Sequence, residues 1–116
     1  MLINLSNHPF DKWTANQKST ALRLYGEVKD LDFPYIDPSW SLDQVHQLAE
    51  EYLSKIKLLP PATVHLMGEL TFCFTLASLL KAQGIPCVAS TTNRMVEEVD
   101  GKKLSTFKFV QFRPYF

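Results

Sequence analysis

Three short polar segments contain the side chains best suited to holding an anionic ligand. They are Ser6-Asn7-His8, Gly68-Glu69 and Ser90-Thr91-Thr92-Asn93-Arg94, and each follows an apolar run. In the third segment, hydroxyl and amide groups can hydrogen-bond phosphate oxygens or base edges, and Arg94 can contact a phosphate through two N–H groups. Surface pairing of Arg94 with Glu97 or Glu98 is the alternative. The pattern favours a phosphate or nucleotide site.

The first segment offers a hydroxyl, an amide and an imidazole in succession, close to the expected start of a helix. Helix N-terminal N–H groups favour an anion, so Ser6 and Asn7 are candidate ligand contacts. His8 could donate to a phosphate or transfer a proton near neutral pH. A turn histidine that only packs or caps is the alternative.

The second segment places a glycine where a strand gives way to a helix. Gly68 would let a ligand or a backbone approach closely. Glu69 could cap the helix, bind a ribose hydroxyl or act as a base, or it could simply complement the helix dipole. No GxGxxG or GxxxxGK[ST] motif occurs in the chain, so this is not a dinucleotide or P-loop fingerprint.

Strand and helix patterns alternate along the chain. Strands are expected at Leu2–Leu5, Val28–Phe33, Thr63–Met67 and Cys87–Ser90, with helices at about Trp13–Tyr25, Leu42–Ile56 and Leu70–Gln83. The last helix is apolar nearly all round and should be buried. Beyond Arg94, the runs 95–99 and 104–112 flank Asp100-Gly101, a strong hairpin signal.

This order predicts an α/β fold: a Rossmann-like open sheet, mostly parallel, with three helices on both faces and a C-terminal antiparallel β-hairpin. Right-handed crossovers would then bring all three polar segments, as strand-to-helix turns, to one sheet edge.

Composition limits the possible classes of protein. A chain of 116 residues with 46% hydrophobic content fits one domain, residues 1–116. Twelve basic and twelve acidic residues give no net charge, which argues against a coat for long DNA or RNA. With no leader and no apolar run of bilayer length, we expect a cytoplasmic protein without membrane contact.

The remaining histidines and cysteines favour structural roles. Cys73 and Cys87 lie in apolar runs and are expected to be buried. His46, on the polar side of a helix, and His65, within a strand, are expected to be solvated or structural. No metal-ligand spacing is present, so neither a metal nor another cofactor is predicted.

Four motifs together carry a resemblance to a known family. They are Leu5-Ser6-Asn7-His8-Pro9, Leu66-Met67-Gly68-Glu69, Val88-Ala89-Ser90-Thr91-Thr92-Asn93-Arg94 and Phe109-Val110-Gln111-Phe112-Arg113. In these the chain resembles small single-domain CRISPR-associated proteins of the CARF (CRISPR-associated Rossmann fold) superfamily. The resemblance implies a homodimer that binds a cyclic oligoadenylate, tetra- or hexa-adenylate, across its two-fold axis.

Stand-alone members of that superfamily are often ring nucleases that degrade this messenger and switch off type III CRISPR antiviral signalling. The resemblance thus implies metal-independent cleavage in which a ribose 2′-hydroxyl attacks the adjacent phosphorus. Arg94 and residues 90–93 would hold a phosphate, Ser6 and Asn7 a ribose or phosphate, and His8 would move the proton, with Glu69 a further catalytic candidate.

Two alternatives stay open. One is a non-catalytic protein that only sequesters the messenger. The other is a nucleoside or nucleotide base-transferase on a similar sheet, with Glu69 or Glu97 as the nucleophile.

Overall fold

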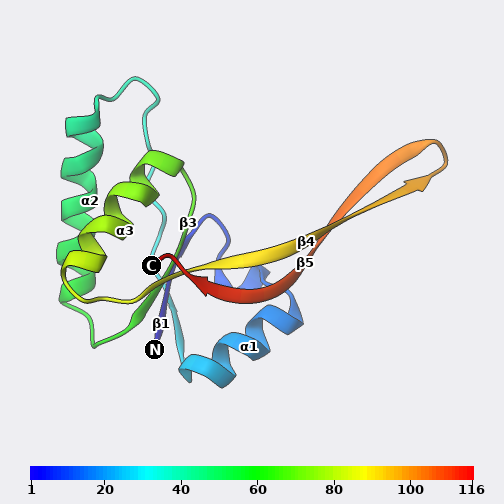
Figure 1. Ribbon diagram of the computed structural model, residues 1–116, viewed down its shortest axis with the longest axis horizontal. Coiled ribbons are helices and arrows are strands. Elements are labelled where there is room, and N and C mark those ends of the chain that lie inside the picture. The colour runs from blue at the N-terminus through cyan, green and yellow to red at the C-terminus, as the bar shows by residue number, and fades with distance from the viewer.

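The computed structural model describes all residues from Met1 to Phe116 and has one five-stranded sheet in the order β2-β1-β3-β4-β5 (Figure 1). The strands are β1 (Leu2–Ser6), β2 (Val28–Asp30), β3 (Thr63–Met67), β4 (Cys87–Val99) and β5 (Lys102–Pro114). The helices are the short 3-10 turn η1 (Phe10–Lys12), α1 (Ala15–Tyr25), α2 (Leu42–Lys57) and α3 (Leu70–Ala82). Only the β4–β5 pairing is antiparallel, which confirms the predicted fold class.

Local sequence explains where the helices begin. Ser41 and Gln44 form a reciprocal capping box at the start of α2, and the hydroxyl of Thr14 accepts the N–H of Gln17 at the start of α1. These contacts satisfy N–H groups that have no partner inside a helix. None of the helices is long and apolar enough to span a membrane.

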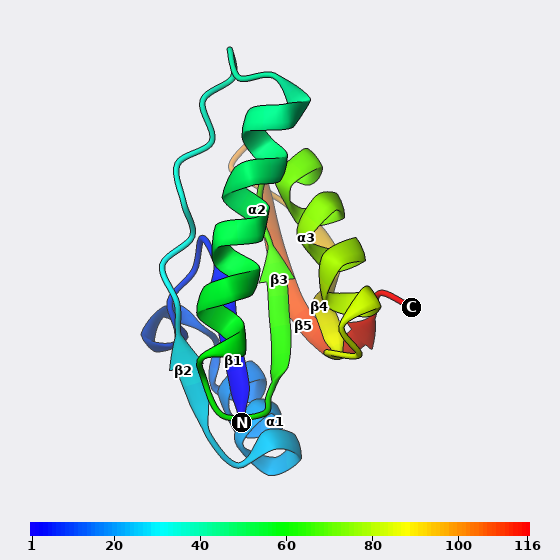
Figure 2. The same ribbon diagram turned by 90° about the vertical axis from the view of Figure 1, so that its left-hand side faces the viewer.

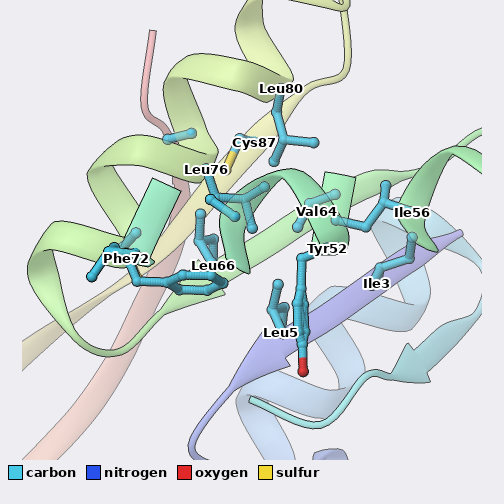
Figure 3. Close-up of a cluster of buried hydrophobic side chains, with 14 residues drawn as sticks. Ile3, Leu5, Tyr52, Ile56, Val64, Leu66, Phe72, Leu76, Leu80 and Cys87 are labelled. Carbon is cyan, nitrogen blue, oxygen red and sulfur yellow. The ribbon is translucent and has the colours of Figure 1, made fainter. Parts of the chain in front are cut away.

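Two separate cores hold the layers together. On one face of the sheet, α2 and α3 lie side by side, with α1 behind the sheet (Figure 2). Leu5 and Leu66 from the strands pack there against Tyr52 and Phe72 from the helices (Figure 3). On the other face, the smaller core contains Leu2, Val88, Trp13, Ala21, Phe109 and Phe112. Burying each large apolar side chain contributes about 1.5–3 kcal/mol.

The hairpin is longer than the sequence predicts, and the expected turn at residues 90–94 is wrong. Strand β4 runs on through this segment because β5 pairs with it from Val88 to Val99. The hairpin turns at Asp100-Gly101, where φ values of 53° and 75° are those that an Asp-Gly turn favours. Beyond the body of the protein the two strands form a free-standing arm (Figure 1).

Two other expectations need correction. Strand β2 ends at Asp30 rather than Phe33, since its pairing with β1 stops where Asp30 lies opposite Asn4. The Asp30 carboxylate accepts hydrogen bonds from the Asn4 side chain and from the backbone N–H of Phe10. Helix α3 is not buried all round, because Leu70 and Phe74 are 82% and 73% exposed. Its other face supplies the core with Phe72 and five further buried residues.

Candidate functional site

A cavity of about 530 Å³ lies beyond the carboxyl ends of the parallel strands, where open α/β sheets place their ligands. Its size falls within the range of about 300–1,000 Å³ typical of small-molecule sites. The residues after β1, the start of α1, the end of β3 and the base of the arm all contribute walls. Six residues that the sequence predicts for the site line it: Ser6, Asn7, His8, Gly68, Ser90 and Thr92.

The charge and aromatic content of this cavity suit an anionic, ring-containing ligand. Lys12 lines it, and no aspartate or glutamate does. Phe107 also lines the cavity and is 60% exposed, although phenylalanine side chains are usually buried. A smaller hollow of about 270 Å³ nearby is lined by Asp30 and Asp32, so its charge would repel an anion.

A buried asparagine, Asn4, anchors residues that line the cavity, although it lines the smaller acidic hollow and not the cavity itself. Asn4 is 1% exposed, and its Nδ2 donates to the carbonyl of His8 at 2.9 Å and to Asp30 Oδ1 at 2.8 Å. Its Oδ1 lies 2.8 Å from Ser6 Oγ and 2.9 Å from His65 Nδ1. Trp13 Nε1 donates to the same His8 carbonyl at 3.0 Å. The backbone of the first polar segment is therefore fixed by Asn4 of β1 and by Trp13, which lies between η1 and α1.

His65 belongs to the cavity wall, a role that the sequence interpretation missed. It is 2% exposed, contacts the rings of Trp13 and Phe112 edge-on, and places Nε2 3.1 Å from Ser90 Oγ. Burial lowers its pKa from 6.5 to about 4, so the imidazole is neutral at physiological pH. The available signal was a polar residue at the middle of each of two apolar strands: Asn4 and His65 are direct cross-strand partners.

Gly68 and Glu69 serve the start of α3. The Glu69 carboxylate accepts the N–H groups of Thr71 and Phe72 at 3.1 and 2.7 Å, as the helix-cap interpretation anticipated. Although desolvation opposes it, these hydrogen bonds hold the pKa of Glu69 below its ordinary value. A side chain at Gly68 would collide with the ring of Phe33. The neighbour that approaches this glycine closely is thus a phenylalanine of the protein itself.

The polar residues of β4 divide between the two faces of the arm. Ser90 and Thr92 line the cavity, whereas Thr91 donates to the carbonyl of Gln111 at 3.3 Å and neither it nor Asn93 lines the cavity. Arg94 lies one step further out on the cavity face, as the cross-strand partner of Phe107. Its guanidinium donates to Ser105 Oγ at 3.1 Å and makes no ion pair with Glu97 or Glu98.

Both cysteines are free and buried, as predicted, and burial raises the pKa of each thiol to about 12. His46 is exposed and pairs with Glu50 at 3.2 Å. No three His, Cys, Asp or Glu side chains lie close enough together to hold a metal ion.

Comparison with known proteins gives a family match over nearly the whole chain. Residues 1–113 match the model of a family described as "Uncharacterized protein MJ1673 family". No curated protein and no solved structure matches the chain.

Proposed function

We propose that this chain, which belongs to the uncharacterized MJ1673 protein family, binds cyclic oligoadenylates in the polar cavity and cleaves them. The observation that carries the proposal is the cavity itself. It combines a lysine, no carboxylate and an exposed phenylalanine at the ligand edge of a Rossmann-like sheet. The resemblance to the CARF superfamily supports the choice of ligand. Such a protein would act in the cytoplasm, to switch off type III CRISPR signalling.

Each part of an oligoadenylate finds a chemical partner in the cavity. Lys12, Asn7 and His8 offer donors for a phosphate group, since the Asn7 and His8 side chains make no hydrogen bonds within the protein. The exposed ring of Phe107 offers a face on which a base can stack, an interaction that is worth about 1–3 kcal/mol per base. Arg94, the cross-strand partner of Phe107, lies outside the cavity on the same face and is the candidate that would hold the next phosphate along the ring.

We further propose that the protein acts as a homodimer. A ring of four or six nucleotides is larger than one such cavity, and a symmetric ring is matched by two cavities around a two-fold axis. The arm leaves Met95, Val96 and Leu104 between 44% and 53% exposed. A two-stranded ribbon is marginally stable on its own, so a second copy that covers these residues would stabilise it.

In the proposed reaction, a ribose 2′-hydroxyl attacks the adjacent phosphorus and the bond from phosphorus to the 5′-oxygen breaks. The products are linear oligoadenylates that end in a 2′,3′-cyclic phosphate. Water takes the proton that the 2′-hydroxyl loses, and His8 is the candidate that gives a proton to the leaving 5′-oxygen, so the step has no net change in protons. Lys12 and Arg94 would stabilise the charge that develops on the phosphate, and in-line positioning would supply much of the acceleration.

One observation favours the non-catalytic alternative. No hydrogen bond within the protein orients the His8 ring, whereas an acid or base usually has such a partner. A protein that only sequesters the messenger would need no oriented ring. The base-transferase alternative has less support: Glu69 is engaged by α3, and Glu97 lies on the arm face opposite Arg94.

Incubation of the purified protein with radiolabelled cyclic tetra-adenylate or hexa-adenylate in EDTA tests the proposal. Binding with conversion to linear products supports the ring nuclease, and tight binding of an intact ring supports sequestration. If the protein neither binds nor cleaves either ring, both the ring-nuclease and the sequestration hypotheses are refuted.

Paired lysine variants assign the effect to the cavity. Lys12→Ala should weaken binding at least tenfold because it removes the cation that lines the cavity. Lys57→Ala, at the far end of α2, removes the same charge and should leave affinity unchanged. Equal affinity in the two variants would place the ligand elsewhere.

A further inference from the structure

The hydrogen bonds of Asn4 determine which atom donates and which accepts in the two hydrogen bonds that connect Asn4 to His65 and His65 to Ser90. Both partners of Asn4 Nδ2, the Asp30 carboxylate and the His8 carbonyl, can only accept hydrogen bonds. The amide nitrogen of Asn4 must therefore face them, and its oxygen must face His65. A flipped amide would set two acceptors against each other on that side.

This orientation determines which nitrogen of His65 carries the proton. Asn4 Oδ1 can only accept, so His65 Nδ1, 2.9 Å away, must donate. The imidazole is neutral in its buried position, and a neutral ring has a single N–H. His65 Nε2 is consequently an unprotonated acceptor, and its neighbour at 3.1 Å is Ser90 Oγ.

Ser90 has one hydroxyl proton, and two groups of the protein compete for it. Met67 Sδ lies 2.9 Å from Ser90 Oγ, on the end of β3. A thioether sulfur is a weak acceptor, and an unpaired buried nitrogen would be costly, so the proton points to His65. With either partner, the proton is engaged inside the protein, and the oxygen lone pairs remain for the cavity.

We infer that Ser90 is a hydrogen-bond acceptor in the cavity and selects a ligand by a donor group. This inference rests on the proposed function and corrects the phosphate-binding role that the family resemblance implied for Ser90. Ser90 was a candidate for donating to a phosphate, but its only proton is not free to do so. A phosphate oxygen placed against the Ser90 lone pairs would be repelled.

The chemistry of the ligand restricts what that donor is. A cyclic oligoadenylate carries two kinds of hydrogen-bond donor, the ribose 2′-hydroxyl and the adenine amino group. The shared requirement is an O–H or N–H that points at Ser90 Oγ. If the donor is the 2′-hydroxyl, the same contact distinguishes a ribose ring from a deoxyribose ring, and it polarises the proposed nucleophile.

Calorimetry with three rings tests the selection. The rings are cyclic tetra-adenylate, its all-2′-deoxy analogue, and an analogue whose purines lack the amino group. One lost hydrogen bond lowers affinity roughly three- to tenfold, so the wild type should bind one analogue at least that much more weakly. Ser90→Ala should remove most of that difference, and the analogue concerned identifies the donor. Ser78→Ala, on the exposed side of α3, should keep the wild-type pattern.

Two calorimetric results would overturn the inference. They are equal binding of all three rings by the wild type, or an undiminished preference in Ser90→Ala. If neither cyclic tetra-adenylate nor cyclic hexa-adenylate binds to the wild type, the proposed function itself is refuted.

Nitrogen NMR tests the hydrogen-bond polarity without any ligand. In ¹⁵N-labelled protein, His65 should be neutral with its proton on Nδ1, and the Nε2 resonance should shift in Ser90→Ala because the hydrogen bond is lost. A proton on Nε2 would release the Ser90 hydroxyl proton from His65 and would contradict the inference, whether or not an oligoadenylate binds.

Discussion

Replacing Asn4 by alanine should cost more stability than its single amide group suggests. The substitution removes four hydrogen bonds, to Asp30, Ser6, the His8 carbonyl and His65. The first three partners lie near the surface, where water can replace Asn4. The His65 Nδ1–H is buried and would stay unpaired, which costs about 1–3 kcal/mol. Part of the energy of the charge-assisted hydrogen bond to Asp30 is lost as well, so the free energy of unfolding should fall by about 3 kcal/mol.

Urea unfolding followed by tryptophan fluorescence measures this loss. The matched control is Asn16→Ala on α1, where the exposed side chain of Asn16 donates a single, part-buried hydrogen bond from Nδ2 to the Phe109 carbonyl at 3.2 Å. That variant should lose about 1 kcal/mol, because only one neutral hydrogen bond is removed and no charged or fully buried donor is left unpaired. Similar free energies of unfolding for the two variants would refute the role of Asn4 as the buried centre of the site.

Further predictions concern packing and protonation near the cavity. Gly68→Ala should lower the free energy of unfolding by about 1–3 kcal/mol, because the new methyl group meets the Phe33 ring. Adding Phe33→Leu to Gly68→Ala should restore part of the lost free energy of unfolding. If urea unfolding shows that the losses of the two single variants simply add in the double variant, this account is contradicted. In the folded protein the pKa of His65 is lowered from 6.5 to about 4. As pH falls, the imidazole is therefore protonated in the unfolded chain before it is protonated in the folded protein, and the folded state loses stability between about pH 6.5 and about pH 4. Relative to His65→Gln, the wild type should lose about 3 kcal/mol over that interval, and a constant difference between them would argue against a buried neutral imidazole.

Features set by neighbouring residues could be predicted from the sequence. The caps at Thr14 and Ser41 and the turn at Asp100-Gly101 each depend on a few adjacent side chains. The mostly parallel sheet also followed from the alternation of strands and helices, since parallel strands need crossover helices between them. These signals were enough to predict that the polar segments after β1 and β3 lie at the same edge of the sheet.

Features set by distant residues could not be predicted. The segment Ser90–Arg94 is polar enough to suggest a turn, but pairing with β5 keeps it extended and moves Arg94 out along the arm. His65 looked structural because its partners, Asn4 and Ser90, lie 61 and 25 residues away in sequence. Nothing near Gly68 in the sequence points to Phe33. Each of these contacts depends on strand register or packing across the fold.

The most direct test of the proposed function is a calorimetric titration of the protein with cyclic tetra-adenylate and cyclic hexa-adenylate. We predict saturable binding of one of these rings with a stoichiometry of one ring for two chains, and affinity that falls at least tenfold in Lys12→Ala. Absence of binding to both rings, or affinity that does not depend on Lys12, would contradict the assignment of the cavity as a cyclic oligoadenylate site.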